Sequence, residues 1–259
     1  MEISELFEGT ASQQLSVRNG SVAGIFGEQG SEIRSAGRYV FVSQGGVWVR
    51  VGRCAYGVSR HWGLWLPPAV VCFAYPMMDS SLVELGVPNA LSRLLPSTVC
   101  VPRCPRDFCA ALKEAGARER HPDAERSLES QLVSAITDAL AIPERLVVTM
   151  PSYGSRLAVV CEAVLRNPSK VGQLDKTAAA LGVSVRTLGR LFKEELGTSA
   201  ANWRRGVQIA MACCALDNGI PASEVAAMLG YGAGAFSTFF RSRLGYSPRE
   251  QALGRGQRR

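Results

Sequence analysis

Residues 178–199, AAALGVSVRTLGRLFKEELGTS, decide how the C-terminal part of this chain folds. Much of the stretch recurs at residues 226–247 as AAMLGYGAGAFSTFFRSRLGYS. In each copy an alanine-rich segment with helical composition stops at a glycine, which adopts a positive φ at little cost and lets the chain turn sharply. A second helix is expected after each turn. The repeat therefore predicts two copies of one helical unit.

The second helix of the first copy has both a start signal and a packing signal. Ser184 is of a residue type favoured at the N-cap position. Four apolar residues at helical spacing predict its buried face, namely Leu188, Leu191, Phe192 and Leu196. Two helices joined by such a short turn form a helix-turn-helix pattern.

The opposite face of this helix is basic. Arg186, Arg190 and Lys193 are spaced i, i+4 and i+7, so three cations line one side, with Thr187 beside them. A major groove offers guanine edges and phosphates that accept from Arg and Lys. A solvated face on an ordinary helical hairpin is the alternative interpretation, and the repeat favours DNA.

The second copy has lost cations at the positions that would read bases. Gly234 and Thr238 occupy the positions of Arg186 and Arg190. We therefore expect the first unit to make most base contacts and the second to contact phosphates. The predicted DNA-contacting residues are Ser184, Arg186, Thr187, Arg190, Lys193, Gly234, Ser237, Thr238, Arg241 and Arg243.

Residues 199–219 are expected to form one connecting helix that fixes the two units. Its apolar stripe comprises Trp203, Val207, Ala210, Met211, Cys214 and Ala215. The motifs A..LGVS.RTL.RLFK.E.GTS, W-R-R and VA..LGY...AF...FR..LGYSP, over roughly residues 173–251, resemble the AraC/XylS family of bacterial transcriptional regulators. The resemblance implies a seven-helix domain whose two helix-turn-helix units enter successive major grooves. Two departures are Gln208, where the family usually has an arginine, and a turn before Ala235 that is one residue shorter.

The charge distribution agrees with this interpretation. The net charge is +7, but residues 1–142 contain 13 basic and 14 acidic side chains, against 16 and 8 in residues 143–259. An excess of cations in the half that contains the repeat is expected of a part that meets phosphates. The start of the chain is acidic, and no apolar run approaches the roughly 20 residues that span a bilayer. Eight cysteines without a scaffold-like spacing favour a reduced, cytoplasmic setting.

The N-terminal part has the texture of short strands. Six are expected, at residues 22–26, 38–42, 47–51, 63–66, 70–75 and 82–85. They suggest a small antiparallel barrel, so the fold class is α+β, with this barrel followed by an all-α domain. The stretches GRYVFVSQGGVWV and LWLPPAVV resemble the cupin-like sensor domain of the same family.

A metal centre is not expected in this barrel. Where metal-binding cupins place histidines, the chain has Glu32, Arg34 and Cys72. His61 and His121 are its two histidines, too few for a histidine-rich site, and His61 is interpreted as a turn residue. We therefore expect no cofactor and no enzymatic activity, and a cupin-type small-molecule enzyme is the disfavoured alternative.

A barrel without metal can still bind a small molecule. The candidate ligand-binding residues are Arg34, Tyr39, Phe41, Trp48, Arg50 and Trp65. Apolar pockets with a few placed polar groups are typical of ligand sites. The same aromatic residues are also ordinary core residues of small barrels, and this second interpretation is favoured for any one of them.

Cys100, Cys104 and Cys109 form a cluster that suggests an alternative signal. Three thiols within ten positions could bind a soft metal or be oxidised, particularly if residues 105–115 are helical. Their spacing is not that of a zinc site, and no fourth ligand is evident. Structural cysteines are the favoured interpretation, with a redox- or soft-metal-responsive regulator as the alternative.

The middle of the chain is expected to link the two parts. Residues 128–141 have the pattern of an amphipathic helix that covers the barrel or pairs with a second chain, and residues 142–154 resemble a linker. Residues 155–166 predict the first helix of the DNA-binding domain. The expected domains are 1–118 (sensor), 119–154 (helix and linker), 155–253 (DNA-binding) and 254–259 (basic tail).

Together these patterns predict a cytoplasmic, sequence-specific transcriptional regulator, activator or repressor. Its predicted partner is double-stranded DNA. A small-molecule effector, RNA polymerase and a second copy of the chain are further candidate partners, and no membrane is expected.

Overall fold

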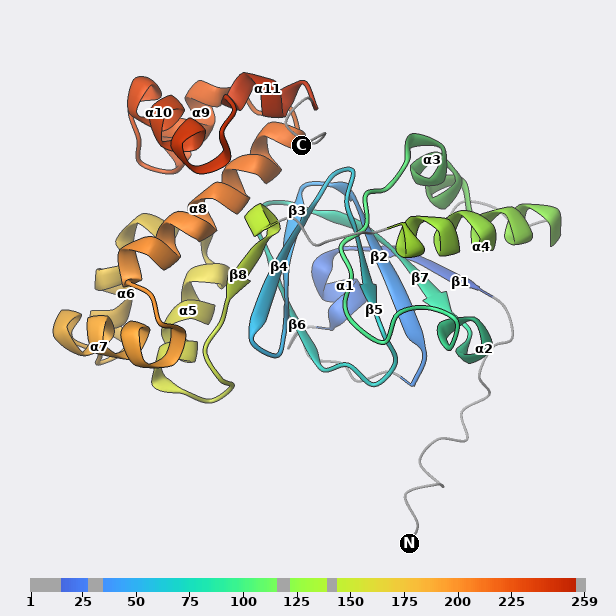
Figure 1. The fold of residues 1–259 in the computed structure, drawn as a ribbon, viewed down its shortest axis with the longest axis horizontal. Coiled ribbons are helices and arrows are strands. Elements are labelled where there is room, and N and C mark those ends of the chain that lie inside the picture. The colour runs from blue at the N-terminus through green and yellow to red at the C-terminus, as the bar shows by residue number, and fades with distance from the viewer. Residues whose placement is uncertain (1–14, 28–34, 116–121, 139–143, 255–259) are drawn as a thin grey trace, which may run out of the picture. The chain divides into compact units, whose positions relative to one another are not determined.

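The computed structural model describes residues 15–27, 35–115, 122–138 and 144–254 (Figure 1). They form two compact units. The first comprises residues within Met1–Gln44, His61–Ala74 and Ser80–Ile142, and the second residues within Gly45–Arg60, Tyr75–Asp79 and Pro143–Arg259. The domain ranges expected from the sequence remain a prediction.

The first unit contains a four-stranded antiparallel sheet in the order β1-β7-β2-β5. Its strands are β1 (Ser16–Gly20), β2 (Gly37–Gln44), β5 (Gly63–Leu66) and β7 (Ser81–Val87), and its helices are α1 (Val22–Phe26), α2 (Asn89–Ser92), α3 (Arg106–Ala115) and α4 (Pro122–Thr137). In the register of the sheet, Tyr39 lies opposite Leu85 on one side and Trp65 on the other.

The apolar face of α4 is buried in this unit. Leu128, Leu132 and Ile136 belong to one buried cluster with Tyr39 and Phe108. Of the two roles expected for this amphipathic helix, the structure therefore supports covering the core of its own chain. Helix α3 covers Arg106–Ala115, a segment for which the sequence left a helix open.

The prediction of a strand at residues 22–26 is wrong, because this segment forms helix α1. Ser21 caps it, since its side chain accepts a hydrogen bond from Gly24 N at 3.2 Å. Val22, Ile25 and Phe26 are spaced i, i+3 and i+4, and the last two are buried. This is helical spacing, which a five-residue window of apolar residues does not distinguish from a strand.

The second unit combines strands with helices. Its strands are β3 (Gly46–Val51), β4 (Cys54–Ser59) and β8 (Val147–Thr149), and its α-helices are α5 (Arg156–Arg166), α6 (Leu174–Ala180), α7 (Val185–Leu196), α8 (Ala200–Asp217), α9 (Ala222–Met228), α10 (Ala233–Leu244) and α11 (Pro248–Ala252). β6 (Cys72–Pro76), whose last residues belong to this unit, lies beside β3 in the order β6-β3-β4-β8. Short 3-10 helices cover Glu144–Leu146 and Pro168–Gln173.

The interpretation of residues 142–154 as a linker is wrong for residues 147–149. Val147–Thr149 form strand β8, which pairs antiparallel with β4 so that Val148 lies opposite Ala55. Because the partner strand lies more than ninety residues earlier in the chain, no local pattern could indicate this pairing.

The predicted fold class is confirmed. Antiparallel sheets form from the N-terminal part and helices dominate the C-terminal part, with seven α-helices from α5 to α11. Five of the six predicted strands overlap with β2, β3, β5, β6 and β7, whereas β1, β4 and β8 were not expected. Within the described ranges, every helix is too short or too polar to cross a membrane.

Candidate nucleic-acid interface

Helices α6 and α7 form the first helix-turn-helix unit. The chain turns between them at Gly182, whose φ of 71° favours glycine. Ser184 is the N-cap of α7, as predicted, because its Oγ accepts from Thr187 N at 3.1 Å. Leu188 and Phe192 are buried, so this side of α7 faces the interior.

The outer face of α7 presents the three predicted cations to solvent. Arg186, Arg190 and Lys193 are all exposed. Arg190 Nη1 donates to both carboxylate oxygens of Glu194, at 2.8 and 3.0 Å. Such an exposed i, i+4 pair contributes only about 0.3–0.5 kcal/mol, so a DNA group can replace Glu194 at small cost. Arg186 has no hydrogen bond or ion pair among the described residues.

Helices α9 and α10 form the second unit with a weaker start. Gly230 turns the chain with φ of 78°. The N-cap of α10 is Gly232, which offers no side-chain cap. Phe236 and Phe240 are buried, and their ring centroids lie 5.7 Å apart. Aromatic packing therefore holds α10 where the first unit uses a cap.

The outer face of α10 bears the five remaining predicted contacts, all of them exposed: Gly234, Ser237, Thr238, Arg241 and Arg243. Ser237 Oγ donates to Ala233 O at 3.1 Å, within the helix. Arg243 Nη2 donates to Asn202 Oδ1 at 2.6 Å, which joins the end of α10 to the start of α8. Cations of this face therefore lie toward the end of α10 and not at its start.

Helix α8 connects the two helix-turn-helix units (Figure 1). It is buried along most of its length. The predicted apolar stripe is confirmed, and every residue from Val207 to Leu216 is buried. Trp203 Nε1 donates to Thr149 O at 2.9 Å. Both helix-turn-helix units contact α8, the first through α7 and the second through α9. This packed helix therefore holds the two helix-turn-helix units at a fixed separation.

Gln208 connects α8 to the turn of the second unit. Its side chain is buried, its Nε2 donates to Leu229 O at 3.3 Å, and Tyr231 Oη donates to its Oε1 at 3.1 Å. A neutral, hydrogen-bonded amide thus occupies the position where the family resemblance implies an arginine.

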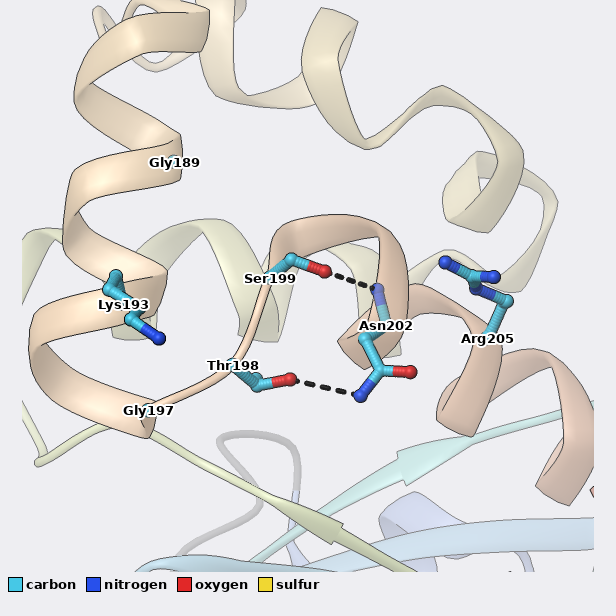
Figure 2. A pocket seen from close by; sticks show the side chains of 7 residues that line it. All are labelled: Gly189, Lys193, Gly197, Thr198, Ser199, Asn202 and Arg205. Carbon is cyan, nitrogen blue, oxygen red and sulfur yellow. Dashed lines mark hydrogen bonds between the residues drawn. The ribbon is translucent and has the colours of Figure 1, made fainter.

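A hollow of about 420 Å³ lies between α7 and the start of α8 (Figure 2). It is lined by Gly189, Lys193, Gly197, Thr198, Ser199, Asn202 and Arg205. Thr198 and Ser199 hold Asn202 through two hydrogen bonds of 3.1 Å. The two charged residues of the lining, Lys193 and Arg205, are both basic. Arg205 and Asn202 are not among the DNA-contacting residues predicted from the sequence. The W-R-R motif was the only available signal for Arg205.

Comparison with known proteins shows what this arrangement of helices is similar to. Residues 177–252 match the sequence profile of a helix-turn-helix domain. The chain is 26% identical over 219 residues to the HTH-type transcriptional regulator NimR of Escherichia coli, covering 82% of this chain and 78% of that protein. The chain contains an AraC-type helix-turn-helix domain. It is a DNA-binding transcriptional regulator of this type.

Further relatives share parts of the chain. The HTH-type transcriptional regulator RipA of Corynebacterium glutamicum is 31% identical over 90 residues, which is 34% of this chain and 27% of RipA. Among solved structures, ToxT from Vibrio cholerae aligns with 93% of this chain and 97% of its own, at 11% identity and a TM-score of 0.35. An AraC-type regulator from Chromobacterium violaceum covers 40% of this chain and 95% of its own, at 24% identity and a TM-score of 0.35.

The ligand-binding residues expected in this AraC-type regulator are distributed over both compact units of the chain. Tyr39, Phe41 and Trp65 are buried in the core cluster of the first unit, whereas Trp48 and Arg50 are buried in the second. Arg50 is bonded to protein groups, because its Nη2 donates to Pro151 O at 2.5 Å and its Nη1 pairs with Glu162. Arg34, with Glu32 and His121, lies outside the described residues. The five described candidates have the environment of core residues.

The other metal-site candidates of the regulator also have structural contacts. His61 lies in a turn with φ of 78°, and its carbonyl accepts from Cys104 N at 2.8 Å. Cys72 is buried and its sulfur accepts from Arg38 Nη2 at 2.8 Å. In the described part of the chain, no three His, Cys, Asp or Glu side chains converge as a metal site would require.

Two thiols of the cysteine cluster, those of Cys100 and Cys104, have raised pKa values. A hydrogen bond with Cys109, followed by burial, raises the pKa of the Cys104 thiol well above its usual range. Burial also raises the pKa of Cys100. Because the thiolate is the form that oxidises and binds metals, a raised pKa disfavours both reactions. These environments support the structural interpretation of the cluster.

Proposed function

We propose that the protein is a sequence-specific regulator whose helices α7 and α10 enter consecutive major-groove segments of one DNA site. The observation that supports this most strongly is the pair of helix-turn-helix units fixed to the buried helix α8. Recognition helices on one face of a duplex must be about 34 Å apart, one helical turn. A rigid connecting helix maintains such a spacing.

The two helices have unequal roles in this proposal. Arg186 is an exposed guanidinium without an internal partner in the described chain, so it is the first candidate for a base edge, with Arg190 beside it. On α10 the matching positions are Gly234 and Thr238. We assign Arg241 and Arg243 to phosphates, together with Lys193. Loss of one bidentate base contact costs about 1–3 kcal/mol of discrimination.

Selection of bound duplexes from a random pool at fixed salt tests this proposal. We expect one motif with two half-sites about one turn apart. Arg186→Ala should relax the sequence preference at one half-site only. Arg60→Ala removes an exposed arginine directly after strand β4 and should relax the preference at neither half-site. The affinity should also fall steeply with salt. A pool without an enriched motif, or equal effects of the two substitutions, would contradict the proposal.

We further propose that the regulator responds to a small polar effector. A hollow of about 580 Å³ lies between α3 and α4 in the first unit, within the size range of small-molecule sites. Arg103, Asp107 and Asp138 line it, and Gln131 Oε1 is buried there without a hydrogen-bond partner among the described residues. Charges of both signs suit a ligand with an amine and a carboxylate.

Filling this hollow tests the effector proposal. Ser134 lines the hollow on α4, and Thr137 is exposed on the same helix outside the lining. A panel of small amino acids and related zwitterions should contain a compound that raises the thermal midpoint of the protein and changes its DNA affinity. Ser134→Trp should abolish both responses and Thr137→Trp should keep them. Equal responses in the two variants would place the effector elsewhere.

The remaining parts of the proposal concern assembly and setting. Because the apolar face of α4 is buried in its own chain, a homodimer must use a different surface. Sedimentation at micromolar concentration distinguishes a dimer from one chain. We also propose contact with RNA polymerase, a cytoplasmic location and the absence of a catalytic step.

A further inference from the structure

The hairpin of β3 and β4 belongs to the same compact unit as the helix-turn-helix helices. It is therefore part of the body that contains α7, although it lies within residues 1–118, which the sequence predicts to be a sensor. Three sets of polar contacts join it to the helices or to the segments beside them, made by Arg50 with Gly52, by Ser59 with Gly45, and by Arg53.

The first anchor is Arg50 on β3. Its side chain is fully buried, its Nη1 pairs with Glu162 of α5, and its guanidinium lies 3.9 Å from the ring centroid of Tyr153. Tyr153 Oη in turn accepts from Gly52 N at 3.1 Å. The turn between the strands is thereby tied to the segment that leads into α5.

The second anchor joins the opposite end of the hairpin to the end of α8. Ser59 Oγ donates to Asp217 Oδ2 at 3.0 Å. Gly45 N donates to Asn218 Oδ1 at 2.9 Å, and Asn218 Nδ2 donates back to Gly45 O at 2.8 Å. With both ends held, the hairpin is a rigid support and not a free loop.

The third contact reaches α7 directly. Arg53, an exposed residue in the turn of the hairpin, donates from Nη2 to Glu195 O at 2.6 Å. Glu195 lies in the last turn of α7, where carbonyl groups have no partner within the helix. The glycine cap that ends α7 uses the carbonyls of Lys193 and Phe192, which leaves that of Glu195 for Arg53. A cation at this end also complements the helix dipole.

We propose that Arg53 is a positioning residue for DNA recognition, which sets the pose of α7 through its C-terminal turn. This inference rests on the proposed role of α7 in reading bases. The hairpin is covalently continuous with β2 through Gln44 and with β5 through His61.

Two simpler roles for Arg53 make different predictions. A direct phosphate contact would lower the salt dependence of binding by about one charge when Arg53 is removed. A merely structural surface contact would change the urea midpoint and affect both half-sites equally. A positioning residue acts only on the half-site that α7 reads, and its removal leaves the salt slope unchanged.

The test uses the full chain and the duplex selected above. Arg53→Ala should weaken binding by about three- to tenfold, as expected for the loss of one solvent-exposed hydrogen bond to Glu195 O. Arg53→Lys, which retains a donor, should recover part of the affinity, and Arg60→Ala should have no effect. On a duplex whose Arg186-dependent half-site is scrambled, Arg53→Ala should lose its effect.

Three results would overturn the inference. They are a loss that persists on the scrambled duplex, a salt slope reduced by about one charge, and equal behaviour of Arg53→Ala and Arg60→Ala. If Arg186→Ala relaxes one half-site while Arg53→Ala leaves the DNA affinity unchanged, this inference alone fails. If Arg186→Ala is silent too, or no motif emerges, the proposed function fails and the inference falls with it.

Discussion

Substitution of Gly46 by alanine should expose how tightly β3 packs on α8. A Cβ atom at Gly46 would lie 2.1 Å from Cys214 Sγ, and the next atoms are Val58 O at 3.4 Å and Met77 Sδ at 3.5 Å. Cys214 is buried in the middle of α8, and Asn218 holds the neighbouring Gly45 through two hydrogen bonds. Neither element can move away easily, so the contact is a true overlap.

The magnitude follows from this geometry. Overpacking of a close-packed core costs about 1–3 kcal/mol. Replacing glycine in a compatible conformation returns about 0.4–1 kcal/mol through the unfolded chain. We therefore expect Gly46→Ala to lower the free energy of unfolding by about 1–2 kcal/mol. Cys214→Ala removes the sulfur that overlaps and alone costs about 1 kcal/mol.

A double-mutant cycle in urea, followed by circular dichroism, measures the coupling. On the Cys214→Ala background the nearest atom to the new Cβ is 3.4 Å away, so Gly46→Ala should cost almost nothing there. Gly206→Ala on α8, where the added Cβ meets no atom within 4 Å, is the matched control. If Gly46→Ala were as harmless as Gly206→Ala, or equally costly on both backgrounds, the packing argument would be refuted.

Three further predictions concern the helix-turn-helix units. Ser184→Ala removes the N-cap of α7 and should lower the free energy of unfolding by about 1 kcal/mol, while Ser184→Asp keeps most of it; urea midpoints check both. Gly189 is exposed in the middle of α7 with open space around it, so Gly189→Ala should raise the unfolding free energy by about 0.5–1 kcal/mol in the same assay, and a loss would contradict an open site. Burial raises the pKa of Tyr246 from 10.0 to about 12, and its hydroxyl donates to Gln251 Oε1 at 2.8 Å. Because the folded protein holds this proton more tightly, stability should fall as the pH rises from about 10 to 12, and Tyr246→Phe should flatten that decline.

Local features of the DNA-binding part could be predicted because short-range signals determine them. Glycine at a positive φ, Ser184 as a cap and apolar residues at helical spacing each act within a few residues, and the repeat supplies the second unit. The buried faces of α7 and α8 follow from apolar residues at helical spacing. The family resemblance extended this to seven helices, and the structure contains them.

Errors arose where the local signal was short or ambiguous. Residues 22–26 contain apolar residues at helical spacing, but five residues are too few to separate a helix from a strand. Val147–Thr149 became a strand only through pairing with β4. Arg50 was expected at a ligand, because a sequence does not show that a cation is already paired with Glu162.

The sequence by itself determined that this chain contains two helix-turn-helix units with unequal basic faces, because the 3.6-residue period, the caps and the charges are properties of contiguous residues. Only the tertiary structure decided which distant segments join them. The β3–β4 hairpin reaches α5 through Arg50, α7 through Arg53 and α8 through Ser59, across sequence separations of more than a hundred residues. Contacts between such distant residues depend on how the whole unit packs, and no local pattern records them.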